Sequence, residues 1–483
     1  MTLRGKILGA VTLLAAQGAL AQDAPPAVEV PPPPAAQAAE PLALDTVLRA
    51  VDASFPLLEA ARQGREAAEG SLRAAEGAFD PSLQLRGTAI VGGYYEYVRG
   101  DLTLRQPTQL WGATLFAGYR IGRGINSGGI PDYYGGYETN EAGEVRAGVQ
   151  VPLLRNGPID SRRAGIRRAE LGRPIAALDI ESASLLYRRG AAEKYWDWVA
   201  AGRRLAIARS LLELATARNQ AIAARVERGD LPAIERNDNL RVVAQRRGRV
   251  VSAERGLQRA AIELSLYFRD AEGRTIMPSE AQLPSDLPEP TPLSPATVAD
   301  DRDAALARRP EVRRLTAQRA QVEVDRELAS NQMMPAIDVS LAASQDLGDG
   351  AYQRARPDVE ASLMLDIPIL NRVARGRLEV ARAGLARLDE QLRYARDRVL
   401  ADVRDALSAV ETALERAELA AQERDIARAV AASERTNFEL GNSTILSVNL
   451  REQAAAEAAV RVVDARADYH KAVAAYRAAT ARP

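Results

Sequence analysis

The residue types that most often carry catalytic chemistry are scarce in this sequence. Among 483 residues there is one histidine, His470, and no cysteine, so a histidine relay, a multi-histidine metal site and a thiolate site lack their ligands. No phosphate-binding sequence G-x-x-x-x-G-K-[ST] occurs, and Gly122-Arg123-Gly124 lacks the following helix that a dinucleotide site needs. We therefore expect no enzyme activity, no cofactor and no metal site, and we interpret His470 as an ordinary helix-surface residue.

Charged side chains are abundant but balanced. Lys plus Arg and Asp plus Glu each number 64, so no net field draws the chain to nucleic acid. Arginines cluster at 162–168 and at 246–249, but acidic residues are interleaved with the arginines along these helical stretches. We interpret both segments as solvated helix faces with ion pairs between residues four apart, and we expect no nucleic-acid partner.

Residues 1–21 have the pattern of a secretory signal peptide. Arg4 and Lys6 form its basic part, residues 7–14 its apolar part, and Ala19-Leu20-Ala21 its cleavage site. A short membrane anchor is the alternative, but the apolar run is short for a hydrocarbon layer about 30 Å thick. A proline-rich linker over 22–41 follows. The lack of cysteine excludes a lipid-modified N-terminal cysteine, so we expect an exported protein without a lipid anchor.

The remaining chain consists of two similar halves, 42–269 and 298–483, joined by a strap over 270–297 that is rich in proline and acidic residues. The sequence pattern of each half predicts, in this order, a helix, a set of strands and a very long helical hairpin. A strand in each half ends in a similar phrase around a proline, Pro152 or Pro368, and a glycine follows at a similar distance. Such a repeat predicts two similar structural units that lie side by side.

Four segments alternate between apolar and polar residues, which predicts half-buried strands. They lie at 83–91, 145–151, 337–341 and 359–367. The first half holds an additional stretch that predicts one more hairpin near 101–121, within a cluster of aromatic residues typical of the border of a membrane barrel. We expect four strands per chain, with six as the alternative if this hairpin joins them.

These strands cannot close a barrel alone. A membrane barrel needs at least eight strands and tolerates no open edge in lipid. A soluble sandwich is the alternative, but helical stretches of great length separate the strand pairs. We therefore expect a transmembrane barrel whose strands come from several copies of the chain.

Residues 159–228 and 372–439 predict nearly unbroken helices. In the helix expected at 372–439, apolar residues recur at intervals of three, four or seven residues, which is the spacing of a coiled-coil seam. These residues are Leu385, Leu388, Leu392, Val399, Val403, Val410 and Leu414. About 65 residues at 1.5 Å each span roughly 100 Å, which exceeds the width of a globular domain. These helices must project, and the glycines Gly229 and Gly441 mark the turns where a second helix returns.

The ordered, duplicated set of features resembles the TolC family of outer-membrane efflux proteins over essentially the whole sequence after Pro41. The likeness rests on the strand-to-helix junctions at Pro152 and Pro368, on the hairpin turns at 228–235 and 440–447, and on a spaced pattern in the last helix. That pattern is Ala465, Tyr469, Ala472 and Tyr476.

The resemblance implies an α+β membrane protein. A homotrimer shares one transmembrane β-barrel in outer-membrane lipid, and a long α-helical coiled-coil barrel extends into the periplasm. Such a protein is a passive duct, and an inner-membrane pump supplies the energy through a periplasmic adaptor (membrane fusion) protein. The adaptor meets the hairpin tips in that family. The corresponding residues here are Gly229, Leu231, Pro232, Ile234, Gly441, Thr444, Ile445 and Leu446. We expect the side chains beside the two glycines to be exposed and to offer the adaptor a small apolar contact.

The periplasmic entrance departs from the family archetype. Two aspartates of the archetype's second half correspond to Ser447 and Leu450, and an arginine of its closing network corresponds to Ser443. The matching positions of the first half, Glu235 and Asp238, are acidic. One hypothesis is that these two acids form a cation-favouring ring; the other is that both lie on a solvated helix face near an N-terminus.

Two functions therefore remain open on the sequence: an outer-membrane duct, and an elongated periplasmic coiled-coil scaffold whose strands form a soluble platform. The strict strand alternation and the aromatic cluster favour the duct. The pattern does not distinguish among drugs, metal ions and polypeptides as cargo.

Overall fold

A computed structural model describes residues 40–92, 96–124, 138–350 and 352–482. The expected signal peptide and nearly all of the expected linker lie outside these residues. The chain divides into two units, Met1–Glu40 and Pro41–Pro483, and every helix and strand that the structure describes belongs to the second.

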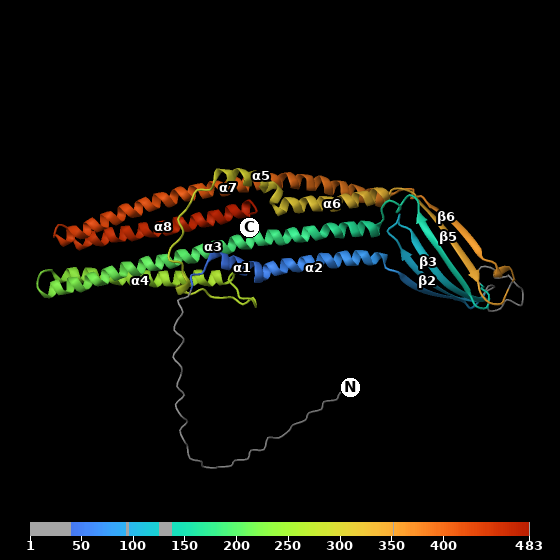
Figure 1. Cartoon of the computed structure of the whole chain (residues 1–483), viewed down its shortest axis with the longest axis horizontal. Coiled ribbons are helices and arrows are strands. Elements are labelled where there is room, and N and C mark those ends of the chain that lie inside the picture. Colours follow the sequence, from blue (N-terminus) through green and yellow to red (C-terminus); the bar gives the residue numbers. More distant parts are fainter. Residues whose placement is uncertain (1–39, 93–95, 125–137, 351, 483) are drawn as a thin grey trace, which may run out of the picture. The chain divides into compact units, whose positions relative to one another are not determined.

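Long helices, packed along their length, dominate the second unit (Figure 1). The helices are α1 (Leu44–Ser54), α2 (Pro56–Glu76), α3 (Ser161–Glu227), α4 (Ala233–Ser265), α5 (Pro295–Arg308), α6 (Pro310–Asn331), α7 (Arg372–Glu439) and α8 (Ile445–Ala479). With 67 and 68 residues, α3 and α7 confirm the two very long predicted helices. Among the described residues, no helix is both long and apolar enough to cross a membrane.

The helices pair as two hairpins, α3 with α4 and α7 with α8, and α3 also packs on α6 and α8. The predicted seam of α7 is confirmed, since Leu385, Leu392, Val399 and Val410 are all buried. Alanines fill many of the other buried positions of this helix, and their small side chains let neighbouring helices approach closely. The two hairpins thus pack on each other mainly through α3 and α8.

The strap between the halves crosses the helices and is anchored to them. Its Leu287 is buried in the largest apolar cluster, together with Trp198, Leu205 and Leu264. The carbonyl of Thr291 accepts a hydrogen bond of 2.5 Å from the hydroxyl of Tyr469 on α8. The strap therefore fastens the two hairpins to each other away from their tips.

Strands from both halves form a single antiparallel sheet in chain order, β1-β2-β3-β4-β5-β6. The strands are β1 (Ser82–Ile90), β2 (Tyr97–Pro107), β3 (Thr114–Gly124), β4 (Glu144–Pro152), β5 (Ala336–Asp346) and β6 (Asp358–Asp366). The expectation of four strands is wrong. The additional hairpin pairs with β1 on one side and β4 on the other, so it is a full part of the sheet.

One face of this sheet is apolar and exposed. Cross-strand register aligns Leu85 with Leu102, Leu102 with Tyr119, and Tyr119 with Val145. Leu85 is 80% exposed and Leu363, on β6, is 69% exposed. A continuous exposed apolar surface of this kind is normally covered by another layer of the protein, by a partner protein or by lipid.

The opposite face of the sheet is charged and more sheltered. Asp101 accepts from Arg99 at 2.8 Å and from Arg120 at 2.9 Å, and Arg120 also pairs with Glu144 at 3.1 Å. These four side chains are only 13–21% exposed. The period-two pattern of the sequence thus separates an apolar face from a charged face, as predicted.

Candidate functional site

Each helical hairpin turns at a glycine in the left-handed region. Gly229 has φ 81° and Gly441 has φ 83°. Asp230 N donates to Arg225 O at 2.9 Å, and Gly229 N donates to Val226 O at 3.0 Å; the same pair of bonds surrounds Gly441. This is a Schellman C-cap at both tips, and it satisfies the last carbonyls of α3 and α7.

The side chains beside these glycines form most of the predicted tip surface. Ile234 and Leu446 are 59% and 63% exposed, and Pro232 and Thr444 are exposed as well. Leu231 is half-buried. The expectation that Ile445 is exposed is wrong: it is 4% exposed, because α8 begins with this residue facing the seam.

The predicted entrance residues differ in their surroundings. Glu235 is half-buried in the first turn of α4, and Asp238 is exposed one turn later. Neither acid has an ion-pair partner within 4.0 Å in the part of the chain that the structure describes. In the second hairpin, Ser443 donates to Glu434, Ser447 N donates to the Thr444 hydroxyl at 3.2 Å, and Leu450 is 60% exposed.

Pro152 and Pro368 lie where strands lead into long helices. Pro152 ends β4, and Asn156 then turns the chain with φ 67°. After Pro368, Asn371 does the same with φ 51°. Asn331 at the end of α6 holds the first of these segments, because its side-chain oxygen accepts from Asn156 N at 2.7 Å. In the second segment, the side-chain amide of Asn371 donates to Met333 O, just after α6, at 2.8 Å. The junctions therefore join strands and helices of both halves.

Sequence reasoning missed a buried charge cluster between the two hairpins. Glu452 of α8 is 4% exposed and pairs with arginines from three other helices: Arg218 of α3, Arg246 of α4 at 3.4 Å and Arg435 of α7 at 3.0 Å. Asn449 also accepts from Arg218 at 2.6 Å. The interpretation of Arg246 as part of a solvated face is wrong, since this side chain is 4% exposed.

The electrostatics of the cluster favour an ionised Glu452. Burial alone disfavours its charged form, but the hydrogen bond and charge of Arg218, with the contributions of Arg435 and Arg246, hold the pKa of Glu452 below its ordinary value. Removal of one member would leave the other charges buried and uncompensated, which is the costly case for an internal ion pair.

A signal for this cluster is present in the sequence. Asn239, Val243, Arg246 and Val250 follow one another at steps of four, three and four, and all are buried. This is the spacing of a coiled-coil seam, so Arg246 occupies a seam position despite its charge. The apolar pattern of α4 is weak around it, which makes a surface interpretation easy to choose.

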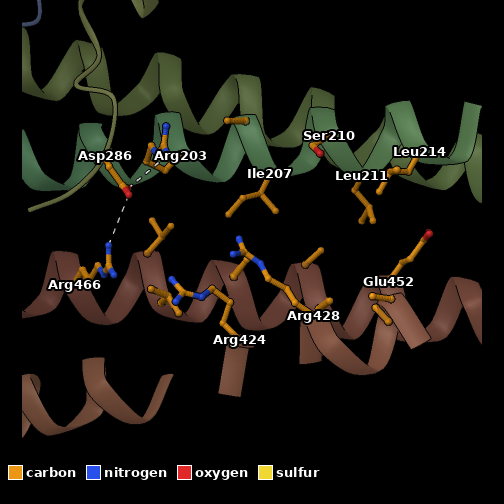
Figure 2. A pocket seen from close by; sticks show the side chains of 18 of the residues that line it. Arg203, Ile207, Ser210, Leu211, Leu214, Asp286, Arg424, Arg428, Glu452 and Arg466 are labelled. Carbon is orange, nitrogen blue, oxygen red and sulfur yellow. Dashed lines mark ion pairs between the residues drawn. The ribbon is translucent and has the colours of Figure 1, made fainter. Parts of the chain in front are cut away.

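A groove of ≈ 480 Å³ runs between α3, α7 and α8 beside the strap (Figure 2). Asp286 of the strap lies 3.5 Å from Arg203 and 3.8 Å from Arg466. Arg424 and Arg428 of α7 point toward the same space (Figure 2). Arginines outnumber acids in the lining, so the groove between the hairpins is positively charged.

His470 is not an ordinary surface residue. Its ring stacks on Trp196 of α3, with 4.2 Å between the ring centroids. The carbonyl of Pro288 in the strap accepts a hydrogen bond of 3.0 Å from its Nε2. Burial lowers the pKa of His470. This histidine therefore helps to hold the strap against α3 and α8.

Comparison with known proteins matches this architecture. Residues 302–482 fit the family model described as outer membrane efflux protein. A comparison with curated protein sequences gives no match. Among solved structures, the outer membrane protein VceC of Vibrio cholerae is 14% identical with a TM-score of 0.63, over 91% of this chain and 96% of that chain.

Two channel structures are similar to the same extent. The CmeC outer membrane channel of Campylobacter jejuni is 13% identical with a TM-score of 0.60, over 91% of this chain and 85% of that chain. The MtrE outer membrane channel of Neisseria gonorrhoeae is 14% identical with a TM-score of 0.62, over 91% and 88%. The family and these neighbours are channel proteins. Residues 302–482 thus match the outer membrane efflux protein family by sequence, and the fold over 91% of the chain is similar to that of VceC.

Proposed function

We propose that the chain is one protomer of a homotrimeric duct in the bacterial outer membrane. The duct exports solutes from the periplasm, or directly from an inner-membrane pump through a periplasmic adaptor protein. The signal peptide at 1–21 directs export, and the protein has no lipid anchor.

One observation carries this proposal: the sheet has an apolar exposed face and two open edges. β1 and β6 each pair with a single neighbour among the described strands. Open edges are not tolerated in hydrocarbon, where every backbone group needs a partner. Copies of the same chain supply that partner, and lipid covers the apolar face.

The energy for export comes from the pump, because a channel of this kind supplies a path and no chemistry. Adaptor docking at the tips is supported by the exposed Ile234 and Leu446 on short capped turns. Pro232 and Thr444 extend this surface, and Ile445 supports it from the interior. The positively charged groove between the hairpins offers an adaptor a second contact, for acidic side chains.

Glu235 and Asp238 are the candidates for a charged entrance. Three copies of two unpaired acids around a narrow opening would favour cations. Ser443, Ser447 and Leu450 bring no charge to the second hairpin's side of the entrance.

Outer-membrane fractionation tests the proposal. We expect the protein in the outer-membrane fraction, extracted only with detergent, and with an electrophoretic mobility that changes on heating, as folded barrels do. Recovery in the soluble periplasmic fraction, with no effect of heating, would instead support the scaffold.

A further inference from the structure

We infer that the β2–β3 hairpin is part of the membrane wall, so that three chains close a barrel of three times six, or 18, strands. The inference rests on the proposed trimer. Without the hairpin, four strands per chain would give a barrel of 12.

The hairpin is continuous with the rest of the sheet. β1 pairs with β2 from Ser82–Arg105 to Ile90–Tyr97, along the whole of β1. β3 pairs with β4 from Thr114–Gln150 to Arg120–Glu144. If the hairpin lay outside the membrane, β1 would lose a partner along its whole length and β4 a partner along Glu144–Gln150 in the described sheet.

The turn of this hairpin is also fixed in place at the helical end of the sheet. Gln106 donates to Phe79 O at 2.7 Å, beside the end of α2. A Cβ atom built on Gly112 would lie 2.6 Å from Asn156 O, next to the start of α3. Short turns on the periplasmic side are typical of outer-membrane barrels, and the turn between β2 and β3 spans only 108–113.

Both faces of the hairpin match those of its neighbours. Leu102 and Leu104 of β2 are 38% and 45% exposed on the apolar face, in register with Leu85 and Leu83. On the charged face, Asp101 and Arg120 belong to the ion-pair ladder that reaches Glu144 of β4. The two strands have 11 residues each, which is the length of about 9–11 residues that a tilted strand needs to cross a membrane.

The width of the helical layer fits six strands better than four. α2, α3, α6 and α7 pack side by side in that order, and each leads directly into or out of the sheet. Four helices about 9 Å apart occupy roughly 36 Å. Strands about 4.8 Å apart and tilted by about 40° take roughly 6 Å each, so six occupy about 37 Å and four only about 25 Å.

An even number of strands also allows closure. β1 and β6 run in opposite directions because neighbouring strands alternate. β6 of one copy can therefore pair antiparallel with β1 of the next copy all around the ring, which leaves no edge in lipid. Barrel diameter grows roughly in proportion to strand number, so the 18-stranded wall is about 1.5 times as wide as a 12-stranded one.

Spin labels on single cysteines test this inference, since the natural chain has no cysteine. We would label L102C, T103C and L104C on β2, and the reference pair S362C and L363C on β6. In phosphatidylcholine liposomes we would compare the accessibility of each label to oxygen and to a water-soluble nickel chelate. We expect several-fold higher oxygen-to-nickel ratios at 102, 104 and 363 than at 103 and 362.

The reference pair separates two kinds of failure. If the β6 pair alternates and all three β2 labels face water, the hairpin lies outside the wall; the inference is then wrong and the proposed function stands. If the β6 pair also fails to alternate, the sheet does not line a membrane and the proposed function is wrong as well.

Discussion

Arg246 of the first hairpin and Glu452 of the second face each other at 3.4 Å inside the helical bundle, and both are 4% exposed. They are 206 residues apart in the chain. The pair therefore joins the two halves of the repeat at a point between the strap and the tips. With Arg218 and Arg435 it forms a charged link across four helices.

The first prediction concerns this link. Glu452→Gln keeps the shape of the side chain but leaves three arginines without their shared counter-ion. We expect the hairpins to lose about 3 kcal/mol of stability against local opening, as is usual when one partner of a buried ion pair is removed. Hydrogen exchange of α3 and α8 amides near the cluster measures this loss.

Glu457→Gln is the matched control on the same helix. Glu457 is half exposed and lies 3.9 Å from Arg249, so its loss should change stability by less than about 0.5 kcal/mol. Equal exchange in the two variants would mean that the buried cluster does not hold the hairpins together.

The second prediction concerns the tip glycines. Gly229→Ala places a Cβ in open space but at φ 81°, which costs an alanine about 1–2 kcal/mol. Gly248→Ala in the middle of α4 also meets open space, at an ordinary helical φ, and should stabilise by about 0.5–1 kcal/mol. The unfolding temperature, measured by circular dichroism, should therefore fall in Gly229→Ala and rise in Gly248→Ala. Shifts of the same sign in both variants would contradict the role of Gly229 as a helix C-cap.

The third prediction concerns pH and the strap. Because the pKa of His470 is lowered by burial, the unfolded chain binds a proton more readily than the folded one. The contribution of His470 to the stability of the strap is therefore complete above about pH 6.5, the ordinary pKa of histidine. This contribution is lost as the pH falls below about 6.5 through the lower pKa of the folded state.

Hydrogen exchange of residues 286–291, corrected for the intrinsic rate, measures this effect. We expect the strap to open more readily at pH 5.5 than at pH 7.5. His470→Phe keeps a ring against Trp196 and removes the titration, so its strap should respond much less. An identical response in both proteins would show that another group controls the strap.

The fourth prediction concerns the entrance. Neutralisation of Glu235 and Asp238 together, by E235Q and D238N, removes six carboxylates from a trimer and should weaken its cation selectivity. Reversal potentials in planar bilayers under a salt gradient measure the change. The control variant E66Q with E272Q removes as many charges from exposed positions elsewhere and should not change the selectivity. Unchanged selectivity in the entrance variant would contradict the hypothesis that Glu235 and Asp238 form a charged ring.

Periodicity predicted the elements that make the fold. The seam from Leu385 to Val410 is buried as its spacing requires, and the alternation around Val145 and Val359 corresponds to β4 and β6. Both patterns are local, because an apolar stripe along one helix or strand can be read without knowledge of its neighbours.

The pairing of elements could not be predicted in the same way. The hairpin around Leu102 was expected, but its place between β1 and β4 depends on a long-range register that spacing within one segment does not encode. Glu452 was missed for a related reason: its three arginines come from three other helices. Ile445 was assigned to the surface because the turn beside it is exposed, whereas its own position faces the seam.

The most direct test of the account is electron microscopy of the protein purified in detergent from outer membranes. We expect end views with three-fold symmetry, and side views in which a helical barrel on the order of 100 Å long extends from the membrane end. A monomer, or a solid rod recovered without detergent, would contradict the shared barrel and with it the function proposed for this chain.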